Sequence, residues 1–246
     1  MTRGEWRSIP ILQRPDESWE YTFSLPRPLA DWDVFAYWER ERFHSMRDHL
    51  TPRDILYDVG TEHGWCNLLY ADYVGPQNMV LIEPSAKFWP NIQETWRRNY
   101  PDTDPLYCYH GLIGAETDDE RDLPTEMVWP DCSDGPLVGA NAYTYLFDNP
   151  LRVPTITLDD LVERSGVVPT AVTMDIEGAE VQALRGAVAL LSTHRPKWWI
   201  SVHPDLAQRD FSDDVEELFD TMERHRYTRQ HLATDHEQHY YFQPKT

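Results

Sequence analysis

The chain has 246 residues, of which 41% are hydrophobic, and this suits one α/β domain with appendages and a substantial core. Its formal net charge is −20, with 42 acidic residues against 22 lysines and arginines. An acidic surface repels phosphate backbones and anionic lipids, so we expect no nucleic-acid polymer and no membrane among its partners.

The cysteines and the N-terminal sequence indicate the compartment. Cys66, Cys108 and Cys132 form no C-x-x-C pair, which argues against a disulfide framework and a structural zinc site. The first residues contain no apolar leader, and no stretch is long enough to span a bilayer. The sequence therefore predicts a cytoplasmic protein, and it leaves the oligomeric state open, a homodimer included.

Residues 1–50 are predicted to be an N-terminal arm and a helix that pack on the core. The first 30 residues are rich in proline and aromatic residues, which favours an extended arm over a helix. Its aromatic side chains either strap the arm onto the core or form one wall of a substrate pocket. The three that matter most are Trp19, Tyr21 and Phe23. Residues 31–50 are predicted to be helical.

The most informative stretch is Ile55–Gly64, ILYDVGTEHG, together with Glu83. A short apolar run ends in Asp58 and is followed by Gly60, Gly64, a helix-compatible stretch, a second apolar run and then Glu83. This order of strand, glycine-containing turn, helix, strand and acid is typical of the first unit of a doubly wound α/β nucleotide-binding fold.

The turn in this unit indicates the kind of ligand. Its spacing is D-x-G-x-x-x-G and not G-x-G-x-x-G, so it lacks the paired glycines that seat a pyrophosphate on a helix N-terminus. Gly60 and Gly64 would let the backbone approach a ligand closely, and Glu83 could accept two hydrogen bonds from a ribose diol. We therefore predict a cofactor with a ribose but no phosphate, of which S-adenosylmethionine is the common one.

The rest of the chain continues the alternation of helix and strand. We expect helices over 87–100, 158–165, 181–191 and around 215–222, strands over 106–113, 171–174 and 197–202, and a closing antiparallel pair over 227–232 and 239–242. Thr157 is the expected N-cap and Gly166 the expected exit of the second of these helices, and Val188 is expected on the buried stripe of the third. Residues 114–153 form a long irregular insertion, which is either a lid over the substrate or a solvated excursion.

Polar residues end the strands of this predicted parallel sheet. They are Asp58, Glu83, His110, Asp175 with Glu177, and His203. Because ligands bind beyond the carboxyl ends of the strands in open parallel sheets, we expect these side chains to converge on one rim. His110 falls where an adenine would lie, and a strand-end histidine without a ligand is an equal alternative.

The sequence resembles the FkbM family of S-adenosylmethionine-dependent methyltransferases. The resemblance is carried by DVGTEHG with IEPS, then TITLDDL, and above all by MDIEGAEVQALRGA. It runs from about Arg53 to the end of the chain and does not cover the N-terminal arm or the 114–153 insertion. It implies an α/β fold, the Rossmann-like class I methyltransferase fold, in which a mostly parallel seven-stranded sheet has helices on both faces and an antiparallel last strand. Residues 51–246 would then be the S-adenosylmethionine-binding domain.

The resemblance also implies O-methyl transfer to a small molecule such as a sugar, glycoside or polyketide-type metabolite. Asp58, Gly60 and Gly64 would touch the methionine and ribose parts of the cofactor, and Glu83 would bind the ribose hydroxyls. The complete set that we assign to the cofactor is Asp58, Gly60, Glu62, Gly64, Glu83, Ser85, His110 and Asp175.

Catalysis needs few groups, because the sulfonium is already an activated methyl donor. The protein has to align the acceptor hydroxyl and remove its proton. We assign Asp175, Glu177 and His203 to this step, with His203 as the base. Asp175 would orient the methionine ammonium or the acceptor hydroxyl, and Glu177 would pair with the acceptor or with Arg185. Alternatively, Glu177 and Glu180 are first-turn helix acids favoured by the macrodipole.

A divalent metal is an alternative that we do not favour. Asp175, His203 and an acid from residues 235–237 could bind Mg²⁺ or a similar ion, which would acidify a bound hydroxyl. In a strand, Asp235 and Glu237 share a face and His236 points away, and no local ligand spacing supports the site. We therefore assign no metal ligands and expect residues 235–237 to form a polar hairpin turn or to line the substrate mouth.

Three other functions stay open. Methylation of a nucleotide or a modified base would use the same cofactor, and the acidic surface argues only against a polymer. A nicotinamide-dependent oxidoreductase shares the fold but needs the missing glycines. A non-catalytic module would bind the cofactor without turnover.

Overall fold

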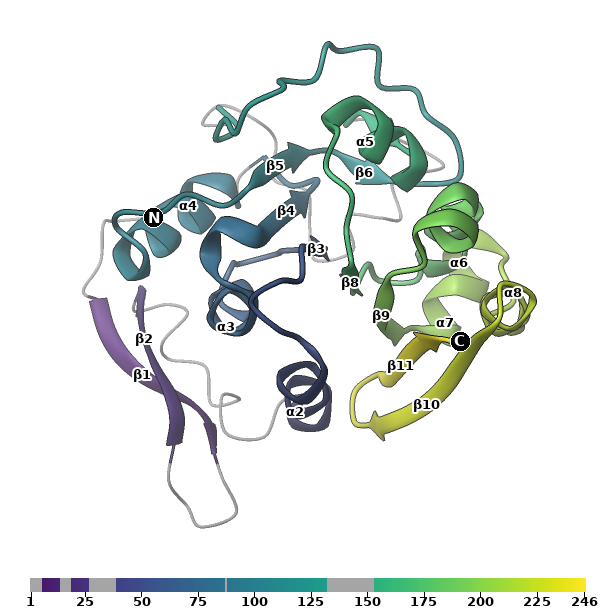
Figure 1. The fold of residues 1–246 in the computed structure, drawn as a ribbon, viewed down its shortest axis with the longest axis horizontal. Coiled ribbons are helices and arrows are strands. Elements are labelled where there is room, and N and C mark those ends of the chain that lie inside the picture. Colours follow the sequence, from purple (N-terminus) through teal and green to yellow (C-terminus); the bar gives the residue numbers. More distant parts are fainter. Residues whose placement is uncertain (1–5, 14–18, 27–38, 87, 132–152) are drawn as a thin grey trace.

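A seven-stranded sheet in the order β10-β11-β9-β8-β3-β4-β5 forms the centre of the protein (Figure 1). The computed structural model describes residues 6–13, 19–26, 39–86, 88–131 and 153–246. The strands of the sheet are β3 (Leu56–Val59), β4 (Met79–Glu83), β5 (Tyr107–His110), β8 (Ala171–Met174), β9 (Lys197–Val202), β10 (Tyr227–Thr234) and β11 (Gln238–Pro244). Neighbouring strands from β9 to β5 are parallel, whereas β11 is antiparallel to both β9 and β10. The predicted sheet with an antiparallel last strand is confirmed.

Helices cover both faces of the sheet. They are α2 (Arg40–His49), α3 (Cys66–Val74), α4 (Trp89–Asn99), α5 (Leu158–Ser165), α6 (Glu180–Arg185), α7 (Pro204–Leu206) and α8 (Glu216–Arg224), with the short helical turns η1 (Pro76–Asn78), η3 (Leu190–His194) and η4 (Ala207–Phe211). Side chains of β3 alternate between two apolar clusters: Leu56 packs with α2, α3 and α4, while Tyr57 and Val59 pack with α5, α6 and α8. Within the described ranges, no helix is both long and apolar enough to cross a bilayer.

The N-terminal arm is an antiparallel hairpin that packs on the core. Its strands are β1 (Trp6–Gln13) and β2 (Trp19–Pro26). The main chain of Ser24 exchanges hydrogen bonds of 2.8 and 3.0 Å with the side chain of Asn99 on α4. Phe23 is buried among residues of α3 and α4, and the ring of Tyr21 meets that of Tyr73 edge-on at 5.9 Å. For these two aromatic residues, the contacts favour packing on the core over a place in the substrate pocket.

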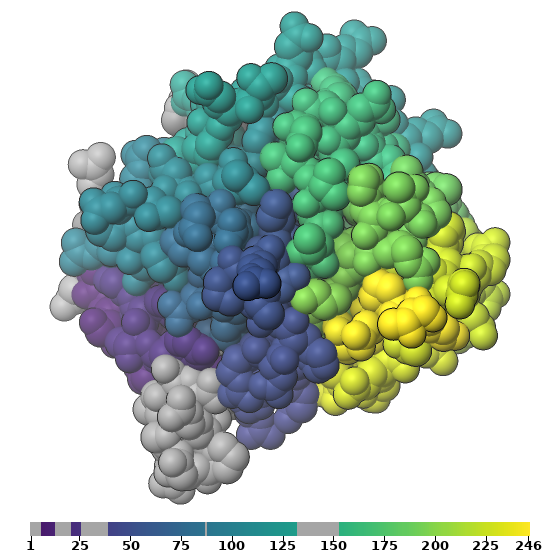
Figure 2. Space-filling model, in the orientation of Figure 1, coloured from purple at the N-terminus to yellow at the C-terminus, as the bar shows by residue number. Residues whose placement is uncertain are grey.

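Helix α2 packs against the C-terminal strands, and Figure 2 shows the two segments side by side on the surface. Trp199 Nε1 donates to Ser45 Oγ at 3.0 Å, and Lys197 Nζ donates to the carbonyl of His49 at 2.8 Å. The ring of Tyr241 lies 4.6 Å from that of His49. This helix is the second part of the one predicted over 31–50, of which residues 31–38 lie outside the described ranges.

The strand predicted over 106–113 is divided in two. β5 ends at His110, and Leu112–Ile113 forms β6, which pairs in a separate small sheet with β7 (Thr155–Ile156). Gly111 permits the turn between them, since a Cβ there would lie 2.5 Å from the ring of Tyr109. The side chain of His110 therefore stays at the end of the main sheet.

Two further predictions concern Val188 and the 114–153 insertion. Val188 is 55% exposed, so its predicted burial is wrong, because α6 ends at Arg185 and the helical period does not continue. Of the predicted 114–153 insertion, residues 114–131 contain no helix or strand, and residues 132–152 lie outside the described ranges. A lid function for this segment stays a prediction.

Replacing Thr157 with alanine should destabilise the protein by about 1 kcal/mol. Thr157 Oγ1 accepts the N–H of Asp160 at 3.0 Å at the start of α5, and Gly166 ends that helix at φ 69°, as predicted. The loss is measured by urea unfolding, with exposed Thr125→Ala as the matched control. Equal unfolding midpoints for the two variants would contradict the assigned cap.

Candidate active site

Glu83 joins the loops that follow β3 and β4 at the carboxyl edge of the sheet. Its carboxylate accepts the N–H of Glu62 at 2.8 Å and the N–H of Ser85 at 2.7 Å. Glu83 is 3% exposed, and burial raises its pKa to about 8 although the two N–H groups lower it. Each carboxylate oxygen has a second lone pair, so the group can still accept hydrogen bonds from a diol.

His110 lies on the neighbouring strand, opposite Glu83. Its Nε2 lies 3.1 Å from the carbonyl of Pro84, which makes Nε2 the protonated ring nitrogen. Burial lowers the pKa of His110, so the ring is neutral at neutral pH. The structure thus brings together Glu62, Glu83, Ser85 and His110, four of the residues that we assigned to the cofactor.

Gly60 and Gly64 make room for the protein itself. They have φ angles of +93° and +80°, and a Cβ at Gly60 would lie 1.9 Å from the carbonyl oxygen of Asp175. A Cβ at Gly64 would lie 3.2 Å from Ile92 on α4. Gly60 therefore lets the loop after β3 touch the loop after β8, and Gly64 lets it pack on α4. The predicted approach of both glycines to a ligand stays a prediction.

Arg42 of α2 reaches the carboxyl ends of β3 and β8. It is 3% exposed, forms an ion pair with Glu39 and donates to Thr173 Oγ1 at 2.5 Å. Its guanidinium also lies 3.5 Å from Asp175 Oδ2. Burial raises the pKa of Asp58 to about 7, and the charge of Arg42 opposes that rise.

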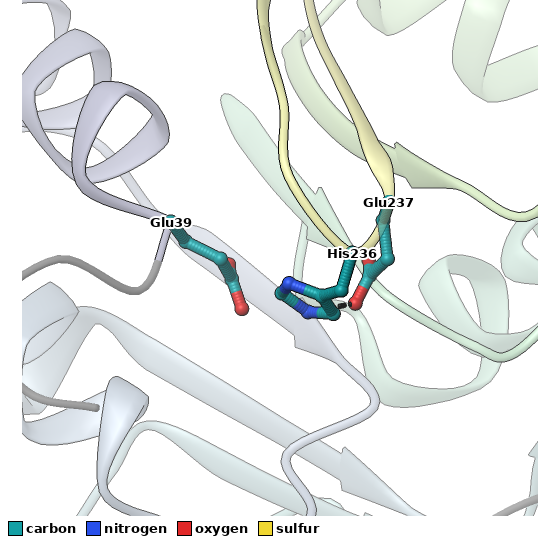
Figure 3. Close-up of side chains that lie close together, drawn as sticks. All are labelled: Glu39, His236 and Glu237. Atoms are coloured by element: carbon teal, nitrogen blue, oxygen red, sulfur yellow. Dashed lines mark ion pairs between the residues drawn. The ribbon is translucent and has the colours of Figure 1, made fainter. Parts of the chain in front are cut away.

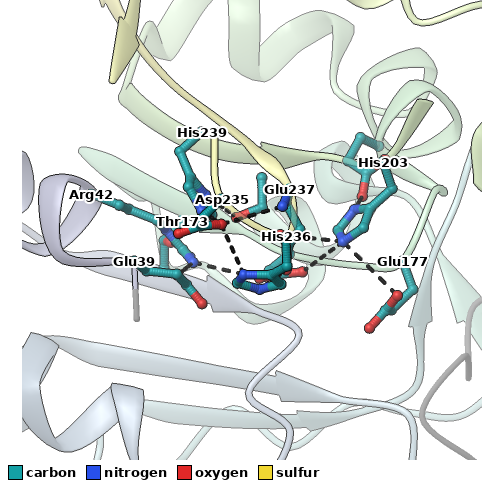
Figure 4. Close-up of polar contacts among 12 residues, drawn as sticks. Glu39, Arg42, Thr173, Glu177, His203, Asp235, His236, Glu237 and His239 are labelled. Atoms are coloured by element: carbon teal, nitrogen blue, oxygen red, sulfur yellow. Dashed lines mark hydrogen bonds and ion pairs between the residues drawn. The ribbon is translucent and has the colours of Figure 1, made fainter. Parts of the chain in front are cut away.

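Three carboxylates face Nε2 of His203, and a fourth holds its other ring nitrogen. Figure 4 shows two of them, Glu177 and Glu237, beside the ring. From Nε2 the distances are 3.2 Å to Glu237 Oε2, 3.6 Å to Asp175 Oδ1 and 3.9 Å to Glu177 Oε2. Nδ1 lies 2.9 Å from Oε1 of Glu180, a residue with no exposed surface. We call these five residues the His203 cluster.

The carboxylates decide the protonation of His203. Burial disfavours the charged ring, but the nearby carboxylates of Glu180 and Glu237 outweigh it and raise the pKa of His203 to about 12. Burial and the charge of Glu237 raise the pKa of Asp175 well above its usual range. A raised pKa favours the imidazolium form of His203 at neutral pH, and the ring has to lose its Nε2 proton before it can act as the predicted base.

The turn between β10 and β11 brings His236 and Glu237 to this rim (Figure 3). His236 lies 2.8 Å from Asp235 and 2.5 Å from Glu237, and Glu39 at the start of α2 faces the same ring. Residues 235–237 form the predicted turn between the two strands and are not part of a strand, so His236 and Glu237 can meet.

Glu177 and Glu180 differ in their environments. Glu177 precedes α6 and has a left-handed φ of 55°, a conformation that costs energy in a residue with a side chain. Arg185, one of its two predicted partners, pairs instead with Asp213 at 2.9 Å and Glu217 at 2.5 Å. Glu180 is a first-turn acid, as the alternative interpretation has it, and it also holds His203.

Sequence reasoning missed Arg42 and Glu39 as parts of this site. Both come from a helix that is far from the rim residues in the chain, and no local pattern marks a buried arginine on it. The contact of Glu180 with His203 had a signal in the sequence, because Glu180 lies inside the D-x-E-G-A-E segment.

Comparisons with known proteins bear on the family and the fold of the chain. Residues 58–229 match the family model of the methyltransferase FkbM domain. The chain is similar to the solved FkbM methyltransferase of Methylobacillus flagellatus KT, with 22% identity, 79% of this chain and 44% of that chain covered, and a TM-score of 0.53. It is also similar to precorrin-6y C5,15-methyltransferase from Geobacter metallireducens GS-15 (8% identity, 85% and 88% covered, TM-score 0.49). A further similar structure is M. jannaschii TYW2 in complex with AdoMet (11% identity, 98% and 100% covered, TM-score 0.47). None of the curated proteins matches the chain significantly.

The sheet order and the antiparallel last strand define a class I methyltransferase fold. The chain belongs to the FkbM methyltransferase family, whose model covers more than half of its residues. Helix α2 and residues 235–237 lie outside the matched range, so Arg42 and Glu237 are contributions of the flanking segments to the rim.

Proposed function

We propose that the protein transfers a methyl group from S-adenosylmethionine to a hydroxyl of a small molecule, such as a sugar, glycoside or polyketide-type metabolite. The observation that carries the proposal is the contact of Gly60 with the carbonyl of Asp175. The loop tied to Glu83 therefore lies directly beside the loop that carries Asp175, which supports a ribose site and a cluster of proton acceptors on one rim. Membership of the FkbM family supports methyl transfer as the reaction.

In this proposal Glu83 binds the ribose hydroxyls. Ser85 and His110 lie on the adenine side, because His110 is next to Glu83 on the neighbouring strand. The methionine part of the cofactor extends along the loop after β3 towards Asp175. That loop carries Gly60, Glu62 and Gly64, and Asp58 lies just before it in β3.

The acceptor hydroxyl would lie beside Asp175 and Glu177, in line with the bond from sulfur to methyl. Its oxygen forms the new bond to the methyl carbon, the carbon–sulfur bond breaks, and the bonding electrons stay on sulfur. The hydroxyl proton passes to Asp175, since a carboxyl with a raised pKa is a stronger base than an ordinary one. Protonated His203 orients the carboxylates of Asp175 and Glu177.

The acidic surface supports a small acceptor over a nucleic-acid polymer, because a net charge of −20 repels a phosphate backbone. A hydroxyl is the acceptor that most needs a base, since it carries a proton that must leave during the transfer.

Two measurements test the proposed function. Calorimetry should detect binding of S-adenosylhomocysteine, and a panel of glycosides and hydroxylated metabolites should yield tritiated product from methyl-labelled S-adenosylmethionine, with and without Mg²⁺ or EDTA. Absence of cofactor binding at about millimolar concentration would reject the proposal. Binding with no transfer to any acceptor would favour a non-catalytic module.

A further inference from the structure

We propose that Asp175, His203 and Glu237 form a binding site for a divalent cation at the rim. Their three facing atoms all lie within 4.8 Å of one another. His203 Nε2 lies 3.2 Å from Glu237 Oε2 and 3.6 Å from Asp175 Oδ1. Ligand atoms at about 2.1 Å from one ion and at right angles to each other are about 3.0 Å apart, so small side-chain shifts suffice.

Glu237 gives an independent indication of a missing ligand. Its side chain is 8% exposed, and within the described part of the chain its Oε2 has no hydrogen-bond partner. This oxygen points at His203 Nε2 without hydrogen-bond geometry. A buried carboxylate oxygen without a hydrogen bond is costly, and a cation between it and the ring would satisfy it.

Glu180 orients the imidazole as a ligand. Its Oε1 holds Nδ1 of His203 at 2.9 Å and also accepts the N–H of Gly178 at 3.1 Å. Metal-binding histidines commonly donate their other ring N–H to a carboxylate in this way, which fixes the tautomer and the ring orientation. Here Nε2 is thereby aimed at Asp175 and Glu237.

The charge around the ring also favours a cation. Asp175, Glu177, Glu180 and Glu237 surround one imidazole, and an excess of partly buried negative charge is unfavourable. A proton on Nε2 supplies one positive charge, whereas a divalent cation in its place supplies two. The neighbouring Glu39–His236–Glu237 group is a weaker candidate because Glu39 already pairs with Arg42.

The donor set indicates the class of ion. One imidazole nitrogen with two carboxylate oxygens suits Mn²⁺ or a related first-row ion, while Mg²⁺ prefers oxygen ligands alone. Open coordination positions could take the acceptor oxygen and lower the pKa of its hydroxyl. This catalytic role of the cation rests on the proposed function, whereas the binding of the cation does not.

Binding of Mn²⁺ to the metal-stripped full chain, without cofactor, tests the site. Electron paramagnetic resonance should show one tightly bound Mn²⁺ per chain, with binding weakened at least about tenfold in Glu237→Gln and in Asp175→Asn. Exposed Glu223→Gln on α8 is the matched control and should bind like the wild type. Zn²⁺ should displace Mn²⁺ more readily than Mg²⁺ does.

Three results would overturn the proposal. They are no Mn²⁺ binding by the folded wild type, Mn²⁺ binding by both site variants as tight as in the wild type, or a loss of binding in Glu223→Gln as large as in the site variants. If Glu237→Gln fails to fold by circular dichroism, Asp175→Asn alone decides, because its side chain is 23% exposed and its replacement has the same shape. If the wild type binds Mn²⁺ and does not bind S-adenosylhomocysteine, the result counts against the proposed function and leaves the cation site standing.

Discussion

Replacing Glu83 with glutamine should weaken binding of S-adenosylhomocysteine by about 10- to 100-fold at about pH 8.5. The variant keeps the shape of the side chain but loses the charge that would accept both ribose hydroxyls. In the wild type, affinity should fall as the pH decreases below about 8, because the buried carboxyl takes up a proton there and the ribose needs its ionised form. Titration calorimetry from about pH 6.5 to 8.5 measures both effects.

The variant should also lose most of this pH dependence, so that the two proteins become similar at low pH. Exposed Glu94→Gln on α4 is the matched control and should retain the affinity and the pH profile of the wild type. An unchanged affinity in a folded Glu83→Gln, or the same pH profile in both proteins, would show that Glu83 does not bind the cofactor.

Replacing Asp175 with asparagine should lower kcat by about 10²- to 10⁴-fold, the usual effect of removing a general base. Asparagine keeps the size of the side chain, so the loop after β8 and its contact with Gly60 should persist. Because the lost group acts on the acceptor proton, affinity for S-adenosylhomocysteine should change much less than kcat. Steady-state kinetics on the acceptor found by screening, with calorimetry on the same samples, separates the two quantities.

Exposed Asp220→Asn on α8 is the control for this variant and should leave kcat unchanged. A kcat within about twofold of the wild type in Asp175→Asn would remove this residue from the proposed chemistry, since a positioned base contributes far more than that.

The parts of the fold that depend on local patterns could be predicted from the sequence. Asp58 and Glu83 follow apolar runs that form β3 and β4, and Thr157 and Gly166 bound α5 as expected. These signals work because a strand period, a helix cap and a left-handed glycine each involve residues close together in the chain. The convergence of Asp175 and His203 also followed, because both end parallel strands at one edge.

The parts that depend on distant segments could not be predicted in this way. Arg42 is a polar residue in a helix, and only the three-dimensional packing shows that it is buried against Thr173 and Asp175. From the sequence, Glu237 is only one of the two acids in residues 235–237 that could serve as a metal ligand. Its approach to His203 depends on the pairing of β9 with β11. Gly60 was assigned to a ligand contact, whereas its immediate neighbour is the backbone of Asp175.

A crystal structure of the protein with S-adenosylhomocysteine tests most directly whether one rim holds both the cofactor and the reacting groups. We expect the ribose hydroxyls within hydrogen-bond distance of the Glu83 carboxylate and the sulfur facing Asp175 and the His203 cluster. A nucleoside bound elsewhere, or a sulfur directed away from Asp175, would contradict the proposed site.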